Sequence, residues 1–242
     1  MLLFKDLIRL SVIMDLKRII KDIDILNKNK EELNARSIFF HVDEQDIHNI
    51  YILIIGQHKQ EDRYTSPYVG GFFLFHMSMS DEYPLVPPKI TFHPKQNFAR
   101  IHPNYYKCGK VCLSVINSWG QEDWTPATSI LSLINILEVR FNEKPLCFEP
   151  CYEMSNEASI QLYNRCVKFG VNTACIVSVL KKTHKEFCIF DDVIASYFLK
   201  HKEAYVRSVE HEAEGDALSP CYQEQFRISY RDILRFFRGY GV

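Results

Sequence analysis

Residues 102–116 read HPNYYKCGKVCLSVI, and this stretch decides which fold and which chemistry we expect of the chain. A polar turn of His102, Pro103 and Asn104 opens it, and Cys112 follows Asn104 by eight positions in an apolar setting. Because proline restricts the backbone, such a turn can hold an asparagine amide beside a neighbouring thiol. A thiol held in this way can carry an acyl group.

Prolines on both sides of this stretch constrain the chain. The upstream run YPLVPPK (residues 83–89) cannot lie inside a central strand, because proline lacks the N–H that the ladder needs. It therefore predicts a stiff connection between two strands. Downstream, Thr125 and Pro126 match the N-cap and the first position of a helix. The apolar stripe of this predicted helix consists of Ile130, Leu131, Ile134 and Leu137.

The region around the motif predicts an α+β domain. Helical spacing of apolar residues predicts a first helix over residues 12–26. Four short β-prone runs then predict an antiparallel four-stranded meander. These runs are residues 38–42, 47–55, 72–77 and 89–92. Residues 93–125 form a long loop, which we expect to be ordered because it carries two tryptophans, several apolar residues and the motif.

The C-terminal part of the chain has a mainly helical pattern. Helices are expected over residues 155–180, 187–205 and 229–237. The acidic residues 210–219 are expected to be solvated. The chain therefore predicts a helical extension after the α+β part.

Composition excludes several classes of protein. The chain has 242 residues with 47% hydrophobic residues, enough for a sizeable core, and its formal net charge of -1 does not favour nucleic acid as a partner. The N-terminal apolar stretch is interrupted by charges, so we expect neither a signal peptide nor a membrane span. An even count of eight cysteines allows four disulfides, but reduced thiols in the cytoplasm or nucleus are expected instead.

The order of these motifs closely resembles the catalytic domain of ubiquitin-conjugating enzymes. The resemblance covers about residues 12–166, so we expect an arm (1–11), a ubiquitin-conjugating core (12–166) and a helical extension (167–242). Residues 149–153, Tyr163-Asn164-x-Cys166 and the terminal helix around Tyr230 and Leu234 also resemble an extended branch of this family. That branch includes the enzyme charged by the alternative ubiquitin-activating enzyme.

The resemblance implies a two-step acyl transfer. Cys112 would accept ubiquitin or a ubiquitin-like modifier as a thioester from an activating enzyme, and a substrate lysine would then attack this thioester. Asn104 would donate its amide to the oxyanion or hold the loop, while His102 and Pro103 would support the turn. Many family members have an aspartate two residues after the cysteine, where this chain has Ser114. Candidate acids for lysine activation are therefore Glu149 and Glu153.

The resemblance also implies partner surfaces. Phe92, Pro126 and Ala127 match the positions that meet a RING-type ligase. The basic residues of the first helix match the side that meets the activating enzyme, and they are Lys17, Arg18 and Lys21. A monomer is expected, with no metal, organic cofactor or ATP site and no nucleic-acid or membrane partner.

Each of these interpretations has an alternative. Cys112 is either a reactive thiol or a core cysteine, Asn104 is either catalytic or a turn residue, and the basic residues are either a docking face or a solvated one. The docking residues also have an ordinary account as a strand end and a helix start.

Other functions also stay open. The pairs Cys108/Cys112 and Cys147/Cys151 could form a four-sulfur zinc site. A cysteine protease is a weaker alternative, because no histidine is placed by sequence as its base.

The main rival function is a non-catalytic interaction module of the same fold, which would bind ubiquitin or a ligase without being charged. Ser114 and the sequence FEPC (residues 148–151), where the extended branch tends to have Asn-Glu-Pro-Gly, leave this rival open. Four extra residues between Cys112 and Trp124 are a further departure from the family pattern. The catalytic interpretation requires an accessible sulfur that is bonded to neither another sulfur nor a metal.

Overall fold

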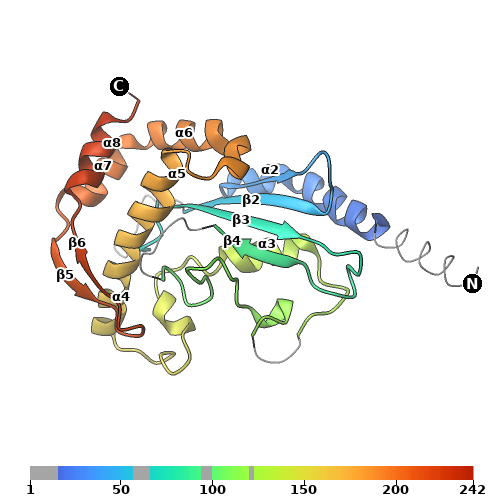
Figure 1. The fold of residues 1–242 in the computed structure, drawn as a ribbon, viewed down its shortest axis with the longest axis horizontal. Helices are drawn as coiled ribbons and strands as arrows, with labels where there is room; N and C mark the ends of the chain where they lie inside the picture. The colour runs from blue at the N-terminus through green and yellow to red at the C-terminus, as the bar shows by residue number, and fades with distance from the viewer. Residues whose placement is uncertain (1–15, 57–65, 94–99, 120–122, 242) are drawn as a thin grey trace, which may run out of the picture. The chain divides into compact units, whose positions relative to one another are not determined.

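The computed structural model describes residues 16–56, 66–93, 100–119 and 123–241 (Figure 1). The chain forms two compact units, each built from three separate segments. The first unit comprises Met1–Ile54, Leu74–Phe92 and Lys110–Val139, and the second comprises Ile55–Phe73, His93–Gly109 and Arg140–Val242. The predicted arm over residues 1–11 lies outside the described residues.

A four-stranded sheet with the order β1-β2-β3-β4 lies mostly in the first unit (Figure 1). Its strands are β1 (Ile38–Val42), β2 (Asn49–Ile55), β3 (Phe72–Ser78) and β4 (Lys89–Phe92). The pairs β1–β2 and β3–β4 are antiparallel, with Phe40 opposite Ile52 and Met77 opposite Ile90. The predicted meander is therefore confirmed, because the β-prone runs are bounded by turn residues and prolines that mark their ends.

Helices of the first unit bury one apolar stripe each. Residues 16–28 are helical, and α2 (Lys30–Ala35) follows directly. The helix at residues 16–28 buries Ile19 and Leu26. At the C-terminus of α2, Arg36 donates a hydrogen bond of 2.9 Å to Asn135 Oδ1 and pairs with Glu138, both in α3 (Ile130–Glu138). Charged groups at the helix ends thus join α2 to α3.

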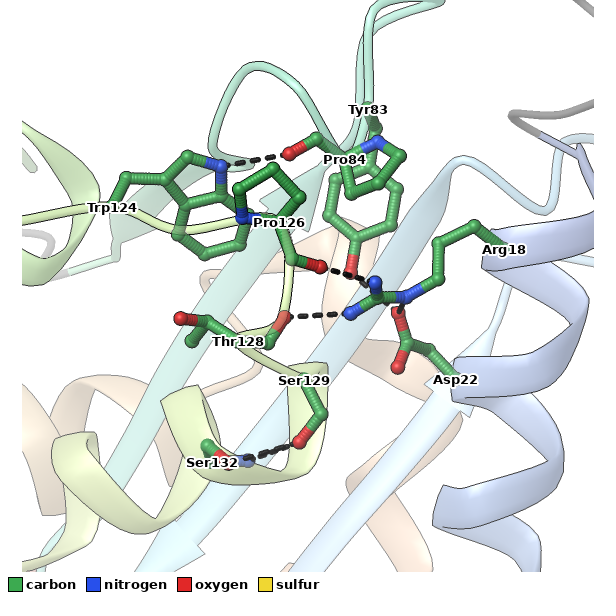
Figure 2. Close-up of polar contacts among 9 residues, drawn as sticks. All are labelled: Arg18, Asp22, Tyr83, Pro84, Trp124, Pro126, Thr128, Ser129 and Ser132. Atoms are coloured by element: carbon green, nitrogen blue, oxygen red, sulfur yellow. Dashed lines mark hydrogen bonds and ion pairs between the residues drawn. The ribbon is translucent and has the colours of Figure 1, made fainter.

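The start of α3 differs from the prediction. The helix begins at Ile130, and its N-cap is Ser129, whose side chain accepts a hydrogen bond from the Ser132 N–H. Figure 2 shows that the Arg18 guanidinium binds the carbonyl oxygens of Pro126 and Thr128 in the preceding segment. Ser129 has an extended backbone (φ -92°, ψ 159°), which separates residues 125–128 from the helix, so the predicted start at Thr125 is wrong.

Asp22 is a buried carboxylate at the centre of this network. It is 1% exposed, and it accepts a hydrogen bond of 2.5 Å from the Tyr83 hydroxyl and one of 2.7 Å from Arg18 Nε (Figure 2). Burial is the main cause that raises the pKa of Tyr83 well above its usual value, and the hydrogen bond to Asp22 is the second. Next to Tyr83, Trp124 Nε1 donates a hydrogen bond of 2.8 Å to the carbonyl of Pro84. The proline-rich run and the tryptophan motif therefore meet in the first unit.

The Asp22→Ala variant is expected to lose about 3 kcal/mol of unfolding free energy. The substitution leaves the buried Tyr83 hydroxyl and the partly buried Arg18 guanidinium without their shared acceptor. Chemical denaturation measures the loss. Asp24→Ala, an exposed position on the same helix, should change the value by less than about 0.5 kcal/mol. Equal losses in the two variants would contradict this account of the network.

The second unit contains a long helical segment with an irregular centre. It begins with α4 (Glu157–Gly170), continues through the π-helix η3 (Val171–Val177) and ends with α5 (Ser178–Leu180). Asn156 caps α4 by accepting from the Ser159 N–H. The side chains of Asn172 and Thr173 donate hydrogen bonds to the carbonyls of Lys168 and Phe169 one turn earlier, and such bonds compete with the regular helical ladder. The predicted helix over 155–180 is confirmed, and the predicted boundary at residue 166 falls inside it.

A β-hairpin interrupts the predicted helical extension. After the 3₁₀ helix η4 (Lys185–Phe190) and the helices α6 (Asp191–Lys200) and α7 (Lys202–Glu210), β5 (Gly215–Leu218) pairs with β6 (Gln225–Ile228). The chain then forms α8 (Arg231–Gly239). Most of residues 210–219 are exposed or half-buried, as expected of a solvated stretch, but Gly215–Leu218 form a strand that the sequence did not predict, and Ala217 and Ser219 are buried.

Aromatic side chains form the core of this C-terminal part. The rings of Phe198 and Tyr205 lie 4.6 Å apart, and both pack against Phe237 of α8. The Tyr205 hydroxyl donates a hydrogen bond of 2.7 Å to the carbonyl of Gly70, which lies in the segment Ile55–Phe73 of the same unit. Among the described helices, none combines the length and the apolarity that crossing a membrane requires.

Candidate functional site

Cys112 lies in the first unit under a short hydrogen-bonded turn. Its Sγ donates to the carbonyl of Ser118 over 3.5 Å, and the residue is a reduced thiol that is only 4% exposed. The Ser118 Oγ closes the turn by accepting from the Leu113 N–H at 2.7 Å and donating to the Leu113 carbonyl at 3.0 Å. The sulfur is bonded to no other sulfur, but the expectation that it is accessible is wrong for this conformation.

The extra residues after Cys112 continue this turn. Ser114 begins the 3₁₀ helix η1 (Ser114–Ile116) and is half-buried. Asn117 follows in the left-handed region, and its Oδ1 accepts a hydrogen bond of 3.0 Å from the Trp124 N–H. Residues 120–122 of the insertion lie outside the described residues. Both described ends of the insertion are thus held by specific hydrogen bonds.

The polar turn of the motif lies in the second unit. His102 is fully buried, and its Nδ1 accepts a hydrogen bond of 2.9 Å from the Asn104 N–H. Because Nδ1 accepts, the proton of the neutral ring sits on Nε2. Burial, reinforced by the charge of Arg140, holds the pKa of His102 well below its usual value. The buried, neutral His102 ring therefore positions the backbone of Asn104, through the hydrogen bond that it accepts from the Asn104 N–H.

Stability is expected to fall with acidity through His102. Its folded-state pKa is depressed, so the unfolded state binds the extra proton below about pH 6.5, and this part of the stability is lost as the pH falls. The loss reaches up to about 1.4 kcal/mol per pH unit. Denaturation between pH 7 and pH 5 should show a shallower pH dependence for His102→Gln than for the natural protein. His211→Gln, at a side chain 89% exposed, should keep the natural slope, and equal slopes in all three proteins would refute the assignment.

Arg100 fastens this turn to the C-terminal hairpin, a connection that the sequence did not reveal. Its guanidinium donates to the carbonyl of Pro103 and stacks 4.7 Å from the ring centre of Tyr222. Glu224 accepts a hydrogen bond of 3.1 Å from the Arg100 N–H and pairs with Lys107 at 2.5 Å. Side chains between β5 and β6 therefore hold both ends of the loop that contains Asn104. Such long-range pairs leave no periodic signal in a sequence.

The two candidate acids differ in their surroundings. Glu149 is half-buried, and its Oε2 accepts a hydrogen bond of 2.5 Å from the Tyr222 hydroxyl. Burial, together with the neighbouring Tyr163 and this bond, raises the pKa of Tyr222 far above its usual value. Glu153 is exposed. The Glu149 carboxylate is thus already engaged by the C-terminal hairpin, whereas that of Glu153 faces solvent.

The backbone conformation of Cys151 shows how the sequence FEPC (residues 148–151), where the extended branch tends to have Asn-Glu-Pro-Gly, makes a turn. Glu149, Pro150, Cys151 and Tyr152 form a turn closed by the Tyr152 N–H and the Glu149 carbonyl at 3.0 Å. Cys151 has a φ of 71°, the left-handed conformation that a type II turn requires after proline. Glycine is the residue that adopts this conformation without strain. The extended branch's Pro-Gly therefore fits the same turn that this chain makes with Pro-Cys.

Cys151→Gly is accordingly expected to raise the free energy of unfolding by about 1 kcal/mol, because it relieves the left-handed strain and Cys151 is exposed. Cys151→Ala keeps the Cβ atom and should leave the free energy unchanged. Thermal or chemical denaturation compares the three proteins. A gain of the same size in the alanine variant would show that loss of the thiol, not relief of the backbone, is responsible.

The predicted partner surfaces are only partly exposed. Phe92 is 1% exposed and packs against Phe75, so it belongs to the core and its predicted contact with a ligase is wrong. Pro126 and Ala127 are exposed. Lys17 and Lys21 are exposed too. The guanidinium of Arg18 is engaged by Asp22 and the carbonyls before α3, so Arg18 is not available for the predicted contact with an activating enzyme.

Comparison with known proteins places this geometry in a family. A family model described as ubiquitin-conjugating enzyme matches residues 18–168, which include Asn104 and Cys112. The chain is 31% identical over 223 residues to ubiquitin-conjugating enzyme E2 Z of Danio rerio, covering 89% of this chain and 65% of that protein. It is 33% identical over 147 residues to ubiquitin-conjugating enzyme E2 Z of Homo sapiens, covering 60% of this chain and 39% of that protein.

A relative from Arabidopsis thaliana is 34% identical over 205 residues, which cover 82% of this chain and 58% of that protein. The chain thus spans about 58% to 65% of the length of the two curated relatives that it matches over most of its own length. The Danio rerio match extends well beyond residue 168, in agreement with the predicted resemblance to an extended branch. With the α+β sheet and the family match over more than half of its length, the chain belongs to the ubiquitin-conjugating enzyme family.

Proposed function

We propose that this protein accepts ubiquitin or a ubiquitin-like modifier as a thioester on Cys112 and passes it to a substrate lysine. The observation that carries the proposal is the position of Cys112: a reduced thiol inside the family match, eight residues after Asn104. Its partners would be an activating enzyme, which consumes the ATP, and a RING-type ligase. Exposed Lys17 and Lys21 would face the activating enzyme, and exposed Pro126 and Ala127 would face the ligase.

The first step would be an exchange between two thiols. The Cys112 thiolate attacks the carbonyl carbon of the modifier's thioester on the activating enzyme, a new C–S bond forms, and the activating enzyme's thiolate leaves. One thioester replaces another, so the step is close to balanced and needs no strong base.

The second step would form an amide. A neutral lysine amine attacks the same carbonyl carbon, the C–N bond forms, and the Cys112 sulfur leaves as the thiolate while the nitrogen loses a proton. An ordinary lysine has a pKa of about 10.4, so the site must remove this proton or desolvate the amine. Glu153 is the freer of the two candidate acids, because Glu149 already binds Tyr222. Asn104 would donate to the oxyanion.

Charging also requires a movement close to the sulfur. Cys112 is buried and its Sγ bonds to the Ser118 carbonyl, so the turn from Leu113 to Ser118 must shift before a second protein can reach the thiol. Two hydrogen bonds of the Ser118 hydroxyl hold this turn closed. Each such bond contributes only about 1 kcal/mol, so opening is energetically accessible.

A charging assay tests the proposal. The protein is incubated with ATP, an activating enzyme and a modifier, and it is then resolved by electrophoresis with and without reductant. We expect an adduct that disappears with reductant, formed with at least one member of a panel of ubiquitin and ubiquitin-like activating enzymes. Failure with every member of the panel, in protein shown to be folded, would refute the proposal.

A second candidate function is a non-catalytic module that binds ubiquitin or a ligase. Three observations favour it: the sulfur of Cys112 is covered, Ser114 replaces the usual acid, and Glu149 is engaged by Tyr222. A module of this kind would bind ubiquitin or a RING domain in a pull-down yet form no adduct. Titration with labelled ubiquitin, read beside the charging assay, separates the two functions.

A further inference from the structure

We propose that His93, His184 and Glu186 form a binding site for a divalent transition metal ion, with Zn²⁺ as the preferred ion. The three residues come from two parts of the second unit that are far apart in the sequence. His93 follows β4 directly, His184 is the residue before η4, and Glu186 lies in the first turn of η4. One ligand atom from each lies within 4.8 Å of the other two.

The spacing of these atoms suits a metal ion. A tetrahedral zinc ion with bonds of about 2.0–2.2 Å keeps its ligand atoms roughly 3.4 Å apart. His93 Nδ1 and Glu186 Oε1 are already 3.2 Å apart. The widest separation in the group, at most 4.8 Å, needs to close by no more than about 1.4 Å, which side-chain rotation supplies. The backbone arrangement can therefore stay as it is.

Two of the three proposed ligands are restricted by their surroundings: a neighbouring aromatic ring contacts His93, and His184 is buried. Phe187 is buried beside Glu186, and its ring meets the His93 ring edge-on with the ring centres 4.8 Å apart. Phe190 is buried at the end of the same 3₁₀ helix. His184 is itself only 5% exposed. An apolar shell of this kind orients ligands and limits access by water, as in known metal centres.

The composition of the group favours a metal over an ion pair. An ion pair between His93 and Glu186 involves two of the three residues, whereas a metal site uses the ligand atoms of all three. A second imidazole at the same point adds repulsion if both rings are charged, whereas two neutral imidazoles and one carboxylate are a common set of zinc ligands. Nitrogen donors also disfavour Mg²⁺ and Ca²⁺, which prefer all-oxygen sites.

This site is separate from the cysteine pairs that the sequence suggested. In the part of the chain that the structure describes, the potential metal ligands that converge are these two histidines and this glutamate, and none is a cysteine. The exposed thiol of Cys188 lies in the same 3₁₀ helix, so the test has to distinguish nitrogen and oxygen ligands from sulfur ligands.

Metal titration of the full chain tests the proposal. After treatment with a chelator and its removal, the protein is titrated with Zn²⁺ against a chromophoric chelator, and separately with Co²⁺ in an absorption spectrometer. We expect one equivalent of Zn²⁺ per chain and a Co²⁺ spectrum without a sulfur charge-transfer band. Glu186→Gln and His93→Gln should each weaken binding at least about tenfold.

Matched controls keep the result specific. Glu203→Gln and His211→Gln change exposed side chains in the same unit and should leave the affinity unchanged. Zn²⁺ should also raise the melting temperature of the natural protein and not that of Glu186→Gln, a readout independent of charging. The proposal is overturned if Glu186→Gln and His93→Gln bind Zn²⁺ like the natural protein. A cobalt–sulfur band that disappears in Cys188→Ser would overturn it as well.

Discussion

Charging of the Cys112→Ala variant is expected to be undetectable, whereas the natural protein forms a reductant-sensitive adduct. Alanine has no sulfur to form the new bond, and the remaining cysteines lack the setting of the motif. Cys112→Ser should form an adduct more slowly, and this adduct should resist reductant because it is an oxygen ester. Electrophoresis with and without reductant separates these three outcomes.

Cys108→Ala provides the matched control, because Cys108 is an exposed thiol four residues earlier in the same loop. It should charge like the natural protein. If reactivity followed exposure alone, Cys108 and not the buried Cys112 would carry the modifier, and the two alanine variants would exchange their behaviour. That outcome would contradict the assignment of Cys112 while leaving the family membership intact.

The sequence predicted the sheet well because its signals are local. The β-prone runs, bounded by turn residues and by Pro84, Pro87 and Pro88, place four strands within two residues of their observed ends. The start of α3 was predicted wrongly, next to a segment that makes non-local contacts. Arg18, more than a hundred residues earlier, binds the carbonyls of Pro126 and Thr128 in the segment that precedes the extended N-cap Ser129.

The candidate site shows the same division between local and distant information. Motif spacing predicts Cys112 as the candidate thiol, but nothing near it in the sequence indicated that the Leu113–Ser118 turn would cover the sulfur. The hairpin of β5 and β6 was missed because its acidic composition is typical of solvated loops. Glu224 accepts a hydrogen bond from the Arg100 N–H and pairs with Lys107, and both contacts join residues more than a hundred positions apart.

The role expected of Phe92 from the family resemblance does not agree with the burial of its side chain. The family position predicts an exposed aromatic contact, but here the ring ends β4 and packs on Phe75 in the core. Pro126 and Ala127 are exposed, so the segment before α3 is the part of the predicted ligase surface that lies at the surface. A residue carried over from a family therefore needs its burial checked before a role is assigned.

Asn104→Ala is expected to reduce transfer to free lysine by about 10²- to 10³-fold while charging of Cys112 stays near the natural level. Transfer to an amine passes through an oxyanion that a side-chain amide can stabilise, whereas thiol exchange is close to balanced and depends on this donor much less. Single-turnover discharge of the preformed thioester, measured after the activating enzyme is stopped, isolates the second step.

The structure allows this experiment to separate catalysis from support of the loop. Asn104 binds His102 Nδ1 through its backbone N–H, which alanine retains, so the substitution removes the amide side chain and keeps this turn contact. The melting temperature should therefore change little, and Asn27→Ala on the first helix should affect neither step. If Asn104 only supports the loop, its loss would instead lower the melting temperature and slow charging and discharge together, because a distorted loop disturbs both reactions of one sulfur.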